Sequence, residues 1–184
     1  MLIRQLLPLA LASLLLAPAP RREADTVVLV VRHAEKAGTS GDVPLSEAGE
    51  ARARALVDIG RAAGVSAVVT TQFQRTRQTA APLAQALGIT PEVLGIRGGV
   101  PEHGKEIADS IRSRFSGRTV LVVGHSNTVP AIVHALGGPK YPDICDDMYD
   151  DLFTVVLSSD GTARVIHGRY GAPSIPTTAC GAMQ

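Results

Sequence analysis

The chain has 184 residues, a length that allows one domain and leaves little room for a second. Its 18 Lys and Arg residues against 17 Asp and Glu residues give a formal net charge of +1, so it lacks the basic excess of a nucleic-acid-binding surface. A hydrophobic content of 45% with 18 Gly and 12 Pro indicates a compact folded domain and excludes a disordered tail or a fibre.

Residues 1–24 are predicted to be a signal peptide or an N-terminal anchor. Arg4 precedes a Leu/Ala run over residues 6–17, and small residues follow, which is the layout of a secretory signal. The run is shorter than the about 20 apolar residues of a comfortable membrane span. Pro20 would follow a cut after Ala19, which is a poor context for cleavage, so an uncleaved anchor stays open. We therefore expect an exported protein, periplasmic or extracellular, that is held at a membrane through residues 1–20 only if this segment stays attached.

Two cysteines follow much later in the chain. Cys145 and Cys180 would be able to form a disulfide in an oxidising compartment and so hold the C-terminal tail; two unpaired thiols are the alternative. Neither lies in a CxxC motif or a Cys/His cluster, so a structural zinc site is not expected. We expect no metal and no other cofactor.

Hydrophobic patterning predicts alternating strands and helices. Runs of β-branched and other apolar residues predict strands at residues 26–31, 67–70, 92–94, 119–123, 152–157 and 163–170. Apolar residues at helical spacing predict helices from the N-cap Ser46 to Gly64, over 76–87, around 107–115 and over 128–136. Pro82 should either kink the second helix or mark its first turn. This order predicts an α/β fold, a three-layer α/β/α sandwich with a mostly parallel central sheet. The domain is expected over residues 25–171, with a C-terminal tail at 172–184.

Two histidines directly follow two of the predicted buried strands. Arg32-His33 comes after the strand at 26–31, and Gly124-His125 after the strand at 119–123. The carboxyl ends of parallel strands lie along one edge of the sheet, where open α/β sheets bind ligands. If the two strands are neighbours, both imidazoles face one pocket.

The residues around these histidines resemble four motifs of one family, in the order in which that family has them. Arg32-His33-Ala34-Glu35 resembles an R-H-G-E signature, and Gly124-His125-Ser126-Asn127 resembles a second G-H motif. Between them, residues 45–49 resemble L-[ST]-x-x-G and residues 71–80 resemble S-x-L-x-R-A-x-x-T-A. The chain is thereby similar to the histidine phosphatase superfamily, the phosphoglycerate-mutase-like enzymes, and in particular to its short phosphatase-type members. The resemblance implies the phosphoglycerate-mutase-like fold.

The resemblance also implies roles for individual residues. His33 would be the nucleophile that forms a phosphohistidine. A phosphoryl group carries negative charge on its peripheral oxygens, so cations and donors must surround it, here Arg32, Arg75 and, if it is protonated, His125. Arg77 competes with Arg75, which has the motif position. Further substrate-binding residues are expected at Ser126 and at Lys36.

The acid that protonates the leaving group is the least defined residue of the predicted site. The resemblance implies a Glu or Asp after the third strand, and Glu102 is placed best for it, with Glu106 and Asp109 as alternatives. Without an acid, the site would favour good leaving groups, such as the imidazole of a phosphohistidine or an activated phosphoester. Residues 143–151 hold five aspartates, and a solvated acidic loop is expected there rather than a cation site.

The predicted function is a metal-independent phosphatase that hydrolyses a phosphomonoester or a phosphohistidine through a phosphohistidine on His33. One alternative is a site that binds phosphate or another anion without catalysis. Another is an esterase with Ser126 as nucleophile, because residues 124–128 nearly match G-x-S-x-G. The expected partner is a phosphorylated small molecule, an envelope component or a phosphoprotein. Nucleic acid is not expected, and membrane contact is expected only if the N-terminal segment is uncleaved.

Overall fold

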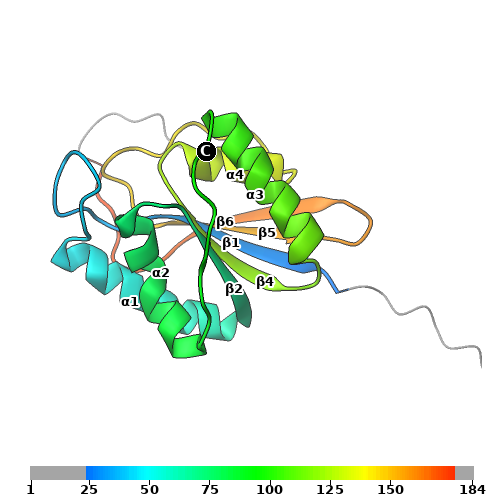
Figure 1. The fold of residues 1–184 in the computed structure, drawn as a ribbon, viewed down its shortest axis with the longest axis horizontal. Coiled ribbons are helices and arrows are strands. Elements are labelled where there is room, and N and C mark those ends of the chain that lie inside the picture. The colour runs from blue at the N-terminus through cyan, green and yellow to red at the C-terminus, as the bar shows by residue number, and fades with distance from the viewer. Residues whose placement is uncertain (1–23, 177–184) are drawn as a thin grey trace, which may run out of the picture.

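The computed structural model describes residues 24–176. The predicted signal peptide or anchor, apart from its last residue, and Cys180 lie outside the described residues. Figure 1 shows one central sheet with helices on both faces. The elements in chain order are β1 (Thr26–Arg32), α1 (Glu47–Ala62), β2 (Val65–Thr70), α2 (Gln74–Leu87), β3 (Glu92–Val93), α3 (Val100–Arg114), β4 (Thr119–Gly124), α4 (Thr128–Ala135), β5 (Asp151–Leu157) and β6 (Ala163–Arg169).

The sheet has six strands in the order β3-β2-β4-β1-β5-β6. β3, β2, β4 and β1 are parallel to their neighbours, whereas β5 runs antiparallel to β1 and β6 antiparallel to β5. A short turn joins β5 to β6, and so short a connection produces an antiparallel pair. The mostly parallel sheet that the sequence predicts is confirmed, as is the adjacency of β1 and β4.

Alternate residues of the central strands face two separate apolar cores. Val28 and Val30 of β1 pack with residues of α3 and α4, while Leu29 and Val31 pack with residues of α1 and α2. Both faces of β1 are therefore covered, which explains its continuous apolar run. In Figure 1, α1 and α2 lie on one side of the sheet and α3 and α4 on the other, which confirms the three-layer sandwich.

The start of α2 differs from the sequence prediction, whereas α4 begins at Thr128 as predicted. Pro82 lies well inside α2, which begins at Gln74, so the proline does not mark the first turn. In α4, Asn127 is the N-cap residue but its side chain makes no capping bond. Instead the hydroxyl of Thr128 accepts a hydrogen bond from the backbone N–H of His125 at 2.8 Å. The start of α4 thus fixes the backbone of a motif histidine.

Gly49 allows α1 to approach the segment that follows β1. The N-cap Ser46 accepts a hydrogen bond from the Gly49 N–H at 3.2 Å, as the sequence predicts. A Cβ atom on Gly49 would lie 2.2 Å from the carbonyl oxygen of Glu35, closer than any real contact. This motif position therefore requires a glycine, because the backbone of α1 lies against the backbone of Glu35, two residues after His33.

The chain reverses its direction of travel across the sheet between β1 and β4. From β1 it crosses through α1 to β2 on one side, and from β4 it crosses through α4 to β5 on the other. Such a switch point leaves a crevice at the carboxyl ends of the two strands, where open α/β sheets bind ligands. No helix among residues 24–176 is long and apolar enough to cross a membrane.

Candidate active site

The two motif histidines meet at this switch point. Arg32 is paired with Gly124 in the β1–β4 register, and the N–H of His33 donates to the Gly124 carbonyl at 2.9 Å. The rings of His33 and His125, which follow these paired residues, lie 5.3 Å apart between centroids. Both side chains are buried. The structure therefore brings together the two imidazoles that the sequence places at strand ends.

The hydrogen bonds of His33 leave one particular ring nitrogen free to react. Its Nδ1 lies 2.8 Å from the carbonyl oxygen of Ala34, which can only accept, so Nδ1 carries the proton. The N–H of Ala34 in turn donates to the Thr79 hydroxyl at 2.9 Å, which holds this segment in place. Nε2 of His33 is thus the unprotonated nitrogen with an available lone pair.

The surroundings of His33 keep its ring neutral. Burial is the largest cause that lowers its pKa, to about 3, and the positive charges of Arg32, Arg75 and Lys36 act in the same direction. The hydrogen bond to Ala34 opposes them but does not compensate. His33 is therefore neutral, with a proton on Nδ1 and none on Nε2, and nucleophilic across the neutral pH range.

His125 is held in the opposite tautomer by a short chain of hydrogen bonds. Nη2 of Arg75 lies 3.3 Å from its Nδ1, and because a guanidinium only donates, Nδ1 accepts. Nε2–H then donates to the hydroxyl of Thr71 at 2.9 Å. The Thr71 hydroxyl lies 3.0 Å from that of Thr76, which bonds to the Phe73 carbonyl at 2.8 Å. Arg75 therefore determines which nitrogen of His125 carries the proton, and Thr71, which no sequence argument singled out individually, accepts that proton.

The sequence argument used His125 as a positive donor, but in the structure without a ligand it is neutral near pH 7. Burial is the largest cause that lowers its pKa, to about 3. Nearby positive and titratable groups lower the pKa in the same direction, namely His33, Arg75, His103 and Arg32. A bound phosphoryl group would act in the opposite direction, since an anion favours the protonated imidazole.

Arg32 is almost completely enclosed. Its Nη1 donates to the carbonyl oxygens of Cys145 and Met148, the latter at 2.9 Å. Its guanidinium carbon lies 4.2 Å from the centre of the Tyr149 ring, and Nη2 lies 3.6 Å from a carboxylate oxygen of Asp146. These contacts fix both the position and the plane of the guanidinium.

Arg75, at the start of α2, contacts the second histidine of the pair. Its guanidinium carbon is 4.4 Å from the centre of the Phe73 ring, and Nη1 is 3.8 Å from a carboxylate oxygen of Asp42. Its competitor Arg77 is exposed and faces away into a groove beside Ala81. The structure thus brings Arg75, and not Arg77, into contact with His125.

Both arginines retain an unused donor. The Nε atoms of Arg32 and Arg75 are buried and have no hydrogen-bond acceptor. A buried donor without a partner is costly, particularly on a charged group. Two such donors on arginines next to a histidine pair indicate a site that an anion completes.

The loop at residues 143–150 is a wall of this site, and the sequence prediction of a solvated acidic loop was wrong in part. The N–H of Ile144 donates to the Ser126 carbonyl at 2.9 Å, next to His125, and two further carbonyls of the loop bind Arg32. Ile144 and Asp150 are buried, while Asp146 is fully exposed. Cys145 of this loop takes part in a disulfide. These long-range contacts leave no periodic pattern in the sequence, so patterning gave no signal for them.

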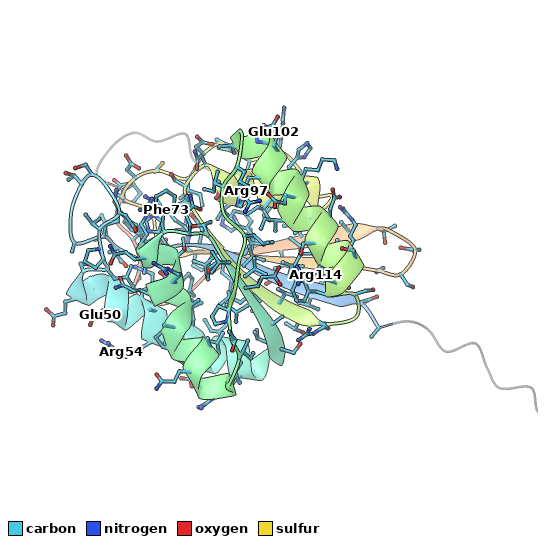
Figure 2. All side chains as sticks on the ribbon, viewed as in Figure 1. Glu50, Arg54, Phe73, Arg97, Glu102 and Arg114 are labelled. Atoms are coloured by element: carbon cyan, nitrogen blue, oxygen red, sulfur yellow. The ribbon has the colours of Figure 1, made fainter. Side chains whose placement is uncertain are left out.

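Glu102 is not brought into contact with the histidines. It is exposed, and its carboxylate lies beside Gly99 at the start of α3. Figure 2 shows Glu102 at that end of the helix, well apart from Phe73, whose ring lies 5.2 Å from that of His125. Glu106 and Asp109 are exposed as well. Among the described residues no hydrogen bond or ion pair joins any of these three carboxylates to either histidine, so the identity of the acid stays a prediction.

Two further residues of the predicted site lie near it. Lys36 is half-buried, and its charge is close enough to lower the pKa of His33. Ser126 follows His125 directly, yet within residues 24–176 its hydroxyl has no hydrogen bond to either histidine. The nitrogens of His125 are occupied by Thr71 and Arg75, so this ring is not placed to activate Ser126. Nor do three or more His, Cys, Asp or Glu residues group as metal ligands in the described part of the chain.

We expect the buried histidines to make the ligand-free protein sensitive to acid. Each has a folded-state pKa of about 3 against 6.5 in the unfolded chain, so between these values only the unfolded chain binds the proton. The free energy of unfolding should therefore fall as the pH falls, by about 2 kcal/mol per histidine between about pH 7.5 and about pH 5. Urea unfolding at the two pH values measures this. His125→Gln should lose less stability over the interval, and an equal loss would contradict the assignment.

Comparison with known proteins finds one family model that matches part of the chain. The family model described as histidine phosphatase superfamily (branch 1) matches residues 28–95, a segment that holds the first three motifs. The similarity predicted from the sequence is therefore confirmed. None of the curated proteins shows significant sequence similarity to the chain.

Solved structures share the fold at low sequence identity. The protein histidine phosphatase SixA complexed with tungstate has a TM-score of 0.61 at 19% identity, over 78% of this chain and 96% of that chain. The mycobacterial glucosyl-3-phosphoglycerate phosphatase Rv2419c has a TM-score of 0.58 at 15% identity, over 80% and 99%. YhfR of Bacillus stearothermophilus has a TM-score of 0.62 at 21% identity, over 76% and 95%. These likenesses support the phosphoglycerate-mutase-like fold, and the named proteins include phosphatases.

Proposed function

We propose that this chain is a phosphatase of the histidine phosphatase superfamily, whose family model it matches over residues 28–95, and that it hydrolyses a phosphomonoester or a phosphohistidine through a phosphohistidine intermediate on His33. The observation that carries the proposal is the hydrogen bond from Nδ1 of His33 to the Ala34 carbonyl. It leaves Nε2 as a neutral nucleophile between two arginines that have unused donors.

In the first step, Nε2 of His33 attacks phosphorus and the bond from phosphorus to the leaving group breaks. Arg32 and Arg75 offer their free Nε–H groups to the peripheral oxygens, where negative charge is spread in the transition state. His33 keeps its Nδ1 proton, because the Ala34 carbonyl stabilises the positive charge that develops on the ring. The leaving group takes its electron pair and then a proton.

In the second step, water attacks phosphorus and the bond to Nε2 breaks, which releases inorganic phosphate and restores neutral His33. The proton of the water passes to phosphate or to solvent. The same arginines bind the phosphoryl oxygens in both steps. This two-step scheme suits a site with two fixed guanidinium groups and a nucleophile that needs no deprotonation.

The substrate should have a leaving group that departs readily. No described carboxylate contacts the histidine pair, so an alkoxide would leave without help from a positioned acid. The imidazole of a phosphohistidine leaves more easily, and an aryl phosphate does so as well. If residues 1–24 direct export, the natural substrate is a periplasmic or extracellular phosphate compound.

Trapping of the intermediate tests the proposal. Full-length protein is mixed with a ³²P-labelled aryl phosphate and quenched with base, in which phosphohistidine survives. We expect one labelled peptide, which contains His33, and label that is unaffected by EDTA. Ser126→Ala serves as the matched control and should be labelled as the wild type is.

Three outcomes would contradict the mechanism. Label on Ser126 would indicate the esterase-type nucleophile. Hydrolysis without any covalent label would indicate direct attack by water. Stoichiometric phosphate binding without hydrolysis of any aryl phosphate or phosphohistidine would indicate a binding protein of the same fold.

A further inference from the structure

The charges around the two neutral histidines cancel before any ligand binds. The cations that act on His33 are those of Arg32, Arg75 and Lys36. The carboxylates that act on the two arginines are those of Asp42, Asp146 and Asp147. Glu35, the other nearby acid, is bound by Arg52 at 2.7 Å. A bound phosphoryl dianion therefore leaves the site with a net negative charge.

Two of these carboxylates, Asp42 and Asp146, are exposed to solvent and lie one beside each arginine. We call them the rim carboxylates of the site. Asp146 lies 3.6 Å from Nη2 of Arg32, and its side chain is 99% exposed. Asp42 lies 3.8 Å from Nη1 of Arg75, is 44% exposed, and accepts from the Gln74 N–H at 2.9 Å. They are held on two different loops that come together only in the fold. A carrier attached to a phosphoryl group at the two arginines therefore lies near both carboxylates.

We propose that Asp42 and Asp146 select substrates by the charge of the group that carries the phosphate. The site accepts a phosphoryl group on a neutral or cationic carrier and discriminates against a carrier with a carboxylate or a second phosphate. This inference rests on the proposed function, since it concerns the same phosphoryl site.

The physical reason is that the cations are fully used by one phosphoryl group. The buried Nε atoms of Arg32 and Arg75 offer donors to that group, and the remaining cation that acts on His33 is Lys36. A second anion would meet the rim carboxylates with no free cation to offset them. A cationic carrier meets the same carboxylates with attraction. The apolar faces of Tyr149 and Phe73, which stack on the arginines, suit an uncharged carrier as well.

A matched ligand series tests this selection. Phosphoethanolamine, glycerol 3-phosphate and 3-phosphoglycerate carry the same phosphate on small carriers with charges of plus one, zero and minus one. Calorimetric titration of the full-length protein should give affinities in that order. We expect roughly threefold per step at low salt, as for exposed charges several ångströms apart. The differences should shrink in about 0.5 M salt, where the Debye length is only a few ångströms.

Variants show whether the two rim residues cause the order. In the double variant Asp42→Asn/Asp146→Asn, the roughly tenfold spread between the first and last ligand should fall to about twofold or less. Glu50→Gln removes an exposed carboxylate that pairs with Arg54 on α1, and it should leave the spread unchanged. Tighter binding of 3-phosphoglycerate than of phosphoethanolamine by the wild type would overturn the proposal. An unchanged spread in the double variant would do the same.

Binding requires no turnover, so this proposal and the proposed function can fail separately. Equal affinities for the three ligands, in a protein that still forms the phosphohistidine, would refute only the charge selection. The expected order in a protein that forms no phosphoenzyme would refute only the catalytic mechanism.

Discussion

Replacement of His33 by Gln is expected to lower kcat for p-nitrophenyl phosphate by about a thousandfold or more. Gln keeps a polar side chain of similar length but offers no nucleophilic nitrogen. The wild type should retain its activity in EDTA, because the proposed mechanism assigns charge stabilisation to Arg32 and Arg75. Steady-state hydrolysis of p-nitrophenyl phosphate by both proteins provides the measurement.

His134→Gln is the matched control for this experiment. His134 lies on α4, where its Nδ1 pairs with the Gly138 carbonyl at 3.0 Å, and it contacts neither motif histidine. Its replacement should leave kcat within about threefold of the wild type. Full activity of His33→Gln would refute the nucleophile assignment and direct attention to Ser126.

Replacement of Arg52 by Met is expected to lower the free energy of unfolding by about 3 kcal/mol, because it leaves a carboxylate without its partner. Arg52 is buried on α1, and its Nε and Nη2 bind the Glu35 carboxylate at 2.7–3.0 Å. Its Nη1 also donates to the Tyr170 carbonyl at 2.9 Å. Since Glu35 lies two residues after His33, activity should fall together with stability. Urea unfolding monitored by circular dichroism measures the change.

A second arginine of the same helix provides the comparison. Arg54 is exposed and lies 3.8 Å from Glu50, an ordinary surface pair, so Arg54→Met should cost less than about 0.5 kcal/mol. Glu35→Gln should be destabilising by itself, and the double variant with Arg52→Met should be less destabilised than the sum of the single changes. Equal losses for Arg52→Met and Arg54→Met would show that the buried pair does not stabilise the segment after His33.

Patterning alone predicted most of the fold. Residues 26–31 were expected to form a strand buried on both faces, and β1 has this form because two helical layers cover it. The element order, the parallel sheet and the place of His33 and His125 at two strand ends followed from local periodicity. Local patterning works here because each strand and helix must bury its own apolar residues, which fixes their spacing along the chain.

Patterning did not reveal the residues that the fold brings to the histidines from elsewhere. Tyr149 and the carbonyls of residues 145 and 148 contact Arg32 across more than a hundred positions of sequence. Asp42 and Asp146 meet the two arginines from separate loops. The same holds for Thr71, whose hydroxyl bonds to a ring 54 positions later. None of these contacts repeats at a strand or helix period.

The sequence by itself therefore determined the layers, the sheet and the candidate nucleophile, because motif and periodicity are both local properties of the chain. Only the tertiary structure decided which nitrogen of each histidine carries a proton, which arginine contacts His125, and which carboxylates lie at the rim. Those properties depend on distances of a few ångströms between loops, and loop contacts are set by the packing of the whole domain rather than by neighbouring residues.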